Sequence, residues 1–283
     1  MRLGRPPIPS KNFLIAESML QSSDVGESEH SAFSYSGTYQ VGDRAQVVSP
    51  STTVSISNGA PAEVTWANHG LANDTPVELS TTGTLPNGLR DDLVYFVVNA
   101  KQGSFNLATA PGRAPVATST AGSGTHTATA TRHDIFEALK PTADTVSSTN
   151  ITGNAPVTVD THWGRVSSTN KWRAFDVSAS SQSIRADSMT FEIRPKGFVD
   201  KIRLENMDAG QVEVTIKDSD DVTQFNDTFS GVEYNWDLSF YSWCSEPVVR
   251  KKSMLIEDLP LITNPRITIT LTADDETVAL GLC

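Results

Sequence analysis

The sequence has few cysteines and no long apolar run. Two cysteines, Cys244 and Cys283, occur among 283 residues. Two thiols do not make the disulfide framework of a small secreted domain, and whether this pair forms a single bridge stays open. No stretch approaches the roughly eighteen or more apolar residues of a membrane span, so we expect no membrane insertion. Residues 1–9 contain proline and arginine without an apolar core, unlike a secretory signal. We therefore expect a protein that is made and folded in a cytoplasm.

Positive charge is also scarce. The chain has 22 Lys and Arg against 33 Asp and Glu, which gives a net charge of −11 and a pI of about 4.9. A nucleic-acid binder needs a basic face to neutralise phosphates, so this balance excludes nucleic acid as a partner. The dense basic run at 250–252 lies among strand-like residues and indicates a solvated strand edge rather than a binding patch.

Groupings of residues that carry chemistry are missing as well. The five histidines show neither HxH nor HExxH spacing, and we expect solvated loop residues, although His133, Asp134 and His162 could approach one another in space. The acidic turn at 218–221 lacks the glycine and the closing glutamate of a calcium loop. No serine stands in a nucleophile-elbow motif. The sequence therefore predicts no catalytic, cofactor-binding or metal-binding residue, and a protein that is not an enzyme.

What the sequence does contain is a series of short β-strands joined by turns. Between residues 52 and 132, short strand-like segments alternate with turns that contain Gly and Asn, a pattern that favours a small barrel. Within residues 177–283, apolar and polar side chains alternate along four segments, at 189–193, 199–204, 212–217 and 266–271. An antiparallel β-sandwich, of jelly-roll or galactose-binding-like form, is the simplest closure for such a set.

One strand is separated from its natural partner. Residues 39–48 indicate a turn followed by a strand, and the matching segment at 134–141 comes some eighty residues later, which is typical of an inserted domain. We therefore predict an all-β chain: a split β-module with an inserted β-barrel, followed by a β-sandwich. The expected parts are an N-terminal arm at 1–36, the split module at 37–51 and 133–176, the barrel at 52–132 and the sandwich at 177–283. The arm either frays or lies on its own body or on a neighbouring subunit.

The insert resembles a repeat found in phage structural proteins. The matching residues are 64–71, 75–77, 83–89, 95–99 and 104–107. This repeat is labelled by its similarity to the first catalytic-cysteine half-domain of ubiquitin-activating enzymes. The stretch in this chain has no cysteine and no nucleotide-binding loop. The resemblance therefore implies a fold and not an activity.

The flanks of the insert resemble the two halves of a chitin-binding domain of the kind attached to chitinases. The matching residues are Tyr39, 41–43, 136–138, Pro156 and Trp163. The continuation at 163–176 is similar to a junction in phage tail and baseplate proteins, where this module passes into a β-sandwich.

Two groups of aromatic residues are candidate contacts for a carbohydrate or a protein partner. Trp163 and Trp172 are close in sequence, and Trp236, Tyr241 and Trp243 form a second group. An aromatic ring on a β-module can stack against a pyranose, but large rings also fill cores and pack along strand edges. The second group alternates with polar residues, as a half-exposed surface would. Both interpretations stay open from the sequence.

The resemblances imply a non-enzymatic structural protein of a tailed bacteriophage, most simply a tail-tip or baseplate component of the virion that is assembled in the host cytoplasm. Its expected partners are other copies of itself, in a symmetric ring, and neighbouring phage tail proteins. Two alternatives remain. One is an adsorption protein that recognises host surface polysaccharide, and the other is a component of the head or neck.

Overall fold

The structure is a computed structural model that describes residues 15–34, 37–139, 163–178, 180–233, 249–281 and 283. These residues form mainly strands and turns, with two short 3-10 helices, η1 (Glu17–Met19) and η2 (Asn170–Trp172). The all-β fold predicted from the sequence is confirmed. In the described part of the chain, no helix is long and apolar enough to reach across a bilayer.

The chain divides into two compact units and passes between them three times. Met1–Glu17 and Ser28–Thr169 make up the first unit, and Ser18–Glu27 and Asn170–Cys283 make up the second. The larger segment of the second unit begins at Asn170, whereas the sequence favoured a sandwich boundary at 177. The first unit contains a barrel and a small sheet, and the second unit contains the remaining sheets.

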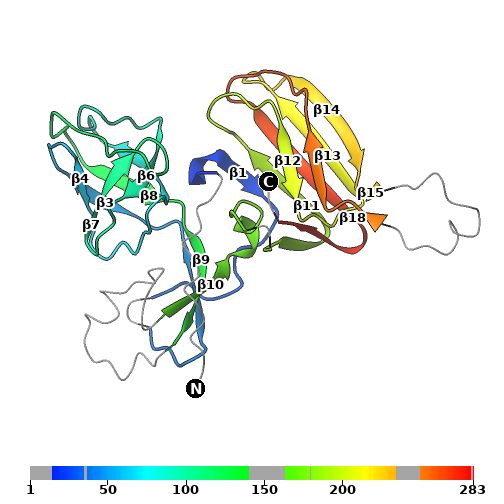
Figure 1. The fold of residues 1–283 in the computed structure, drawn as a ribbon, viewed down its shortest axis with the longest axis horizontal. Coiled ribbons are helices and arrows are strands. Elements are labelled where there is room, and N and C mark those ends of the chain that lie inside the picture. Colours follow the sequence, from blue (N-terminus) through cyan, green and yellow to red (C-terminus); the bar gives the residue numbers. More distant parts are fainter. Residues whose placement is uncertain (1–14, 35–36, 140–162, 179, 234–248, 282) are drawn as a thin grey trace, which may run out of the picture. The chain divides into compact units, whose positions relative to one another are not determined.

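The first unit contains a closed barrel of six strands (Figure 1). The strands follow one another around the barrel in the order β3-β4-β7-β6-β5-β8. They are β3 (Ser51–Ile56), β4 (Glu63–Thr65), β5 (Pro76–Thr81), β6 (Val94–Val98), β7 (Ser104–Ala108) and β8 (His126–Ala130). Side chains from these strands fill the interior, and Val64, Tyr95 and Phe105 are each at most 1% exposed. The β-barrel predicted from the sequence is therefore confirmed.

Two barrel loops lie against each other, and glycine is needed where they touch. Gly88 has a φ of +109°, and a Cβ there would lie 2.3 Å from the carbonyl oxygen of Ala117. Gly122 has a φ of +70°, and a Cβ there would lie 2.4 Å from the carbonyl oxygen of Thr84. A positive φ and so close a backbone neighbour are together compatible with glycine alone. The Gly88 turn thus holds the two loops in contact.

Segments that precede and follow the barrel in the sequence form a three-stranded sheet. Its order is β10-β9-β2, with β2 (Arg44–Val48), β9 (His133–Ala138) and β10 (Trp163–Ser168). β2 pairs with β9 antiparallel, from Arg44 opposite Glu137 to Val48 opposite His133. The pairing predicted across the insert, between residues 39–48 and 134–141, is therefore present.

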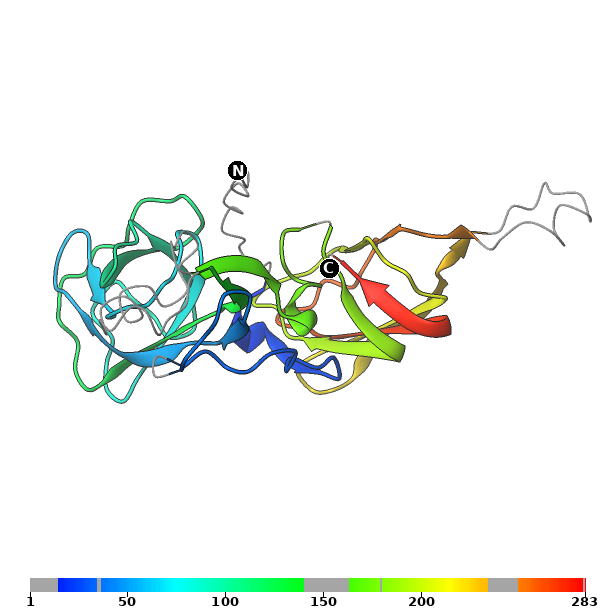
Figure 2. The same cartoon turned by 90° about the horizontal axis from the view of Figure 1, so that it is seen from below.

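The second unit is built on a five-stranded sheet in the order β1-β11-β18-β13-β14. Its strands are β1 (Leu20–Ser23), β11 (Ser183–Ile193), β13 (Gln211–Lys217), β14 (Thr223–Ser230) and β18 (Arg266–Leu280). The long strands β11 and β18 run side by side in both views (Figures 1 and 2). Two smaller sheets pair β12 (Ile202–Glu205) with β17 (Ser253–Ile256), and β15 (Val232–Glu233) with β16 (Val249–Arg250).

One face of the five-stranded sheet is apolar. Along β13, Val212, Val214 and Ile216 alternate with polar residues, and each is at most 2% exposed. On β12, Ile202 and Leu204 alternate with polar residues in the same way and are also buried. This burial pattern is the one expected for packed antiparallel sheets with a solvated outer face. The finer choice between a jelly-roll and a galactose-binding-like closure stays a prediction.

Part of the predicted N-terminal arm lies on its own chain. β1 pairs with the end of β11, with Ser23 opposite Phe191. The Asp24 carboxylate accepts a hydrogen bond from the amide of Thr190 at 2.7 Å and lies 3.0 Å from Arg185 Nη1. These contacts make residues 18–27 part of the second unit, with β1 as one edge strand of its five-stranded sheet.

Candidate functional site

The structure places two of the candidate aromatic contacts in the core. Trp163 on β10 is 1% exposed, and its ring lies edge-on to that of Tyr39, with 4.8 Å between the centroids. Trp172 in η2 is 0% exposed and packs edge-on to Phe175 at 5.9 Å. A ring without an exposed face cannot stack on a sugar, so the core interpretation applies to both. Trp236, Tyr241 and Trp243 lie outside the described residues.

The expectation of solvated histidines is wrong for three of them. His69, His126 and His133 are 4%, 7% and 0% exposed, because each ring is enclosed by the strands or loops around it. His162, which could approach His133 in space according to the sequence, lies outside the described residues, as does Cys244. Cys283 is a free thiol. Over the described residues, no group of three or more His, Cys, Asp or Glu side chains could hold a metal ion.

The barrel and the three-stranded sheet are linked by two connections that run side by side. The amide of Ser49 donates to the carbonyl of Arg132 at 2.9 Å, and the amide of Ala130 donates to the carbonyl of Pro50 at 3.0 Å. Ionisable side chains from three segments of the first unit gather at this place. We call this group the charged joint, and it consists of Glu17, Arg132, His133, Asp134 and Arg165.

At the centre of the charged joint, one carboxylate contacts two guanidinium groups. Asp134 accepts a hydrogen bond from Arg165 Nε at 2.7 Å through one oxygen and from Arg132 Nε at 3.3 Å through the other. The side chains of Arg132, Asp134 and Arg165 are 6%, 9% and 2% exposed. Arg165 also donates to Ser168 Oγ at 3.0 Å, while its Nη1 has no hydrogen-bond partner among the described residues. Charges this deeply buried are rare unless they are paired.

Strand register explains why these distant residues meet. In the pairing of β9 with β10, Ser168 lies opposite Asp134 and Arg165 lies opposite Phe136. The register shifts between Arg165 and Ser167. Such an irregularity changes the direction of the side chains beside it, and here Arg165 reaches Asp134.

Arg132 connects the sheet to the barrel. Its Nη1 donates to the carbonyl of His69 at 3.5 Å, and its guanidinium carbon lies 5.1 Å from the centre of the Phe136 ring. The His69 ring is itself fixed, because its Nδ1 accepts a hydrogen bond from the amide of Leu71 at 2.9 Å. Its Nε2 therefore carries the proton and donates to the carbonyl of Lys101 at 2.6 Å. Burial lowers the pKa of His69, which favours the neutral ring.

A second part of the charged joint surrounds His133. Its Nε2 lies 2.6 Å from Glu17 Oε2 and 3.2 Å from Ser49 Oγ. In a catalytic triad, the acid and the serine contact different nitrogens of the histidine. Here both contact the same nitrogen, so His133 is not arranged as a base for Ser49. The amide of Glu17 also donates to Thr131 Oγ1 at 2.7 Å. These contacts anchor the N-terminal segment and do not activate a nucleophile.

From the sequence we expect no role for the arginines of the charged joint, although one signal is present. Residues 131–136 read Thr-Arg-His-Asp-Ile-Phe, which puts three ionisable residues at the start of an apolar strand. In the structure β9 is buried on both faces. Ionisable residues on such a strand need partners, and the sequence does not say which residues supply them.

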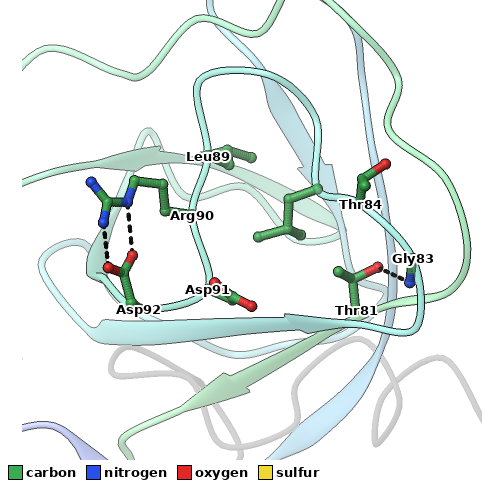
Figure 3. Close-up of a pocket in the computed structure, with 8 residues that line it drawn as sticks. Thr81, Gly83, Thr84, Leu89, Arg90, Asp91 and Asp92 are labelled. Carbon is green, nitrogen blue, oxygen red and sulfur yellow. Dashed lines mark hydrogen bonds and ion pairs between the residues drawn. The ribbon is translucent and has the colours of Figure 1, made fainter.

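An open hollow lies on the surface of the barrel (Figure 3). Its volume is about 420 Å³, and it is lined by Thr81, Gly83, Thr84, Leu85, Leu89, Arg90, Asp91 and Asp92. Arg90 and Asp92 form an exposed ion pair, with Nε donating to Oδ1 at 2.8 Å. The amide of Arg90 donates to the buried Tyr95 hydroxyl at 2.8 Å, which fixes the loop. The lining holds no histidine, cysteine or aromatic ring, so the hollow has neither a nucleophile–base pair nor a stacking surface.

Comparisons with known proteins give no family. No protein-family model matches the chain. No curated protein matches it either. Among solved structures, the chain is similar to the coconut allergen cocosin, with 9% identity and a TM-score of 0.16 over 84% of this chain and 75% of that one. It is also similar to procruciferin, an 11S globulin from Brassica napus, with 10% identity and a TM-score of 0.15 over 93% and 84%. TM-scores this low carry no information about function.

Proposed function

We propose that this chain is a non-enzymatic structural protein of a tailed bacteriophage, located in the tail of the virion at the tip or baseplate. In this proposal the β-units are spacers that hold contact surfaces in fixed positions. The inserted barrel is one of those surfaces. The observation that carries the proposal is the charged joint, because it uses buried ionisable groups to fix one domain to another and presents none of them to a substrate.

A barrel attached by two strand connections could in principle turn about them. Arg132 opposes such a motion, because it contacts Asp134 on the sheet and the carbonyl of His69 on the barrel. Turning the barrel would take the His69 carbonyl away from the buried Arg132 guanidinium, and a hydrogen bond to a charged group is typically worth about 1.5–3 kcal/mol. A barrel held in this way keeps its orientation relative to the three-stranded sheet. Fixed orientation is what a spacer in an assembly requires.

The residues that carry the resemblance to the phage repeat support the same function. Trp66 and Leu71 are 7% and 3% exposed and belong to the barrel core. The His69 ring is used in two hydrogen bonds to the backbone. Gly88 packs against Ala117. Each of these residues has an architectural role in the barrel, as expected for a motif that implies a fold and not an activity.

The proposed partners are other copies of this chain, in a symmetric ring, and neighbouring tail proteins. Residues 18–27 belong to the second unit of their own chain.

Two measurements test the proposal. Mass spectrometry of purified particles of the phage that encodes the chain should detect it, and gold-labelled antibody should mark the tail. Light scattering coupled to size-exclusion chromatography should give a closed oligomer for the purified chain. A chain that stays monomeric and is missing from the particles overturns the proposal. Gold label on the head or neck would instead support the alternative position in the virion.

A further inference from the structure

The strand β14 forms one edge of the five-stranded sheet (Figure 1). The sheet order places β14 beside β13 and beside no other described strand. Within its eight residues, Phe225 and Phe229 are partly covered and the others are exposed. An edge of this length offers amides and carbonyls to a second strand, including an identical one. The opposite edge needs less protection, because β1 has four residues and an irregular register.

Most of the features that usually protect an edge strand are missing from β14. Its sequence, Thr-Gln-Phe-Asn-Asp-Thr-Phe-Ser, contains no proline, lysine or arginine, and Asp227 is its one charged residue. Threonine and phenylalanine favour strands. The pairing with β13 is regular from Phe225 to Ser230, so no bulge turns the middle of this edge away. Any protection at the middle of β14 therefore depends on Asp227.

Asp227 lies on the core-facing side of the sheet. It is opposite Val214, and it stands between Phe225 and Phe229 on the same face. Val214 is 0% exposed, whereas Asp227 is exposed because β14 is the outermost strand. The Asp227 carboxylate accepts a hydrogen bond from the amide of Thr228 at 2.8 Å. A charge that points to the core side of an edge strand is a known means of preventing strand addition.

We propose that Asp227 prevents the β14 edge of one copy from pairing with the β14 edge of a second copy. A strand added beside β14 would enclose the carboxylate on the apolar face and remove it from water without a cationic partner. Self-pairing adds repulsion between the two copies. Consider two β14 strands that pair antiparallel with their core faces on the same side. In one register, residues 224–230 of one copy pair with residues 224–230 of the other. In a second register, residues 223–229 of one copy pair with residues 223–229 of the other. The two carboxylates then lie directly opposite or on the diagonal, with their Cβ atoms about 5 Å or about 7–8 Å apart.

Substitution of Asp227 tests this proposal in the full chain. We expect Asp227→Thr, which removes the charge and keeps strand propensity, to tighten self-association by at least about tenfold in sedimentation velocity. Backbone amides of residues 223–230 should also exchange more slowly with deuterium as the protein concentration rises. This exchange reports on the β14 edge itself, so the result is independent of whether the chain also forms the proposed ring.

The matched control is Asp220→Thr, which makes the same change in charge within the turn that precedes β14. This variant should behave like the wild type. If Asp227→Thr does not fold, Asp227→Asn, which keeps the side-chain shape, takes its place and should also self-associate more tightly than the wild type. If the amides of residues 223–230 exchange as fast in both Asp227 variants as in the wild type at every protein concentration, the proposal is overturned. Equal association by the Asp220 variant also overturns it, because net charge would then be the cause.

Discussion

Replacement of Asp134 by Asn should strongly destabilise the first unit. The side chain keeps its shape but loses its charge, and Arg132 and Arg165 are left as buried cations beside a neutral amide. The guanidinium nitrogens lie 3.3 Å and 2.7 Å from the Asp134 oxygens. Removing one partner from a buried ion pair typically costs about 3–5 kcal/mol. We expect a loss in that range in the free energy of unfolding of the first unit.

The same strand supplies the control. Glu137 on β9 also pairs with an arginine, Arg44, at 3.1 Å, but the two side chains are 36% and 44% exposed. Exposed ion pairs are worth about 0–1 kcal/mol. Glu137→Gln should therefore change the stability of the first unit by less than about 1 kcal/mol. The two substitutions remove the same charge from the same strand and differ in burial.

Stability should be measured by hydrogen exchange on peptides, because this method reports on each unit separately and a chain with two units does not unfold in a single step. Exchange from β9 and β10 reports the first unit, and exchange from β13 and β18 provides a reference in the second. Asp134→Asn should accelerate exchange in β9 and β10 and leave the reference unchanged. If Asp134→Asn and Glu137→Gln differ by less than about 1 kcal/mol, the charged joint does not stabilise the unit as argued.

Three further predictions concern the barrel and the buried aromatic rings. Burial lowers the pKa of His69 in the folded barrel. Below about pH 6.5 the unfolded chain therefore binds a proton at His69 more readily than the folded barrel does. The contribution of His69 to the free energy of unfolding should therefore fall as the pH drops below that value. Urea midpoints between pH 7 and pH 5 should therefore fall more for the wild type than for His69→Gln, and equal slopes would contradict this. Gly88→Ala should destabilise the barrel by at least about 1–3 kcal/mol more than Gly112→Ala, since both have positive φ but only Gly88 has a backbone oxygen 2.3 Å from the new Cβ. Equal urea midpoints for the two glycine variants would count against the packing argument. Trp163→Ala and Trp172→Ala should each cost about 3–5 kcal/mol in their own unit, measured by amide exchange, and unchanged exchange would show that the ring is not part of a core.

The sequence predicts the strands best where they alternate cleanly. The segments expected at 189–193, 212–217 and 266–271 lie within β11, β13 and β18. The pairing predicted between residues 39–48 and 134–141 is seen between β2 and β9. β14 was missed, because Asp227 interrupts the apolar face that Phe225 and Phe229 would otherwise mark. The charge that is proposed to protect β14 therefore also breaks the alternation of apolar and polar residues from which a strand is predicted.

The candidate site could not be predicted in the same way, because it depends on contacts between distant residues. Trp163 is enclosed by Phe33 and Tyr39, which come from a segment more than a hundred residues earlier. Nothing near Trp163 in sequence distinguishes a ring in the core from a ring on a surface. The contact between Arg165 and Asp134 depends on a register shift in β10, and such irregularities leave little trace in a single sequence.

The position of β1 has a consequence for synthesis on the ribosome. The amide of Thr190 donates to Asp24, which is 166 residues away, so the nascent chain emerges with its first strand long before that strand's partner is translated. At about 5–20 residues per second, the interval is roughly 8–33 s. β1 reads Leu-Gln-Ser-Ser, with one apolar residue. A strand this polar exposes little apolar surface to other nascent chains during the interval before its partner β11 is translated.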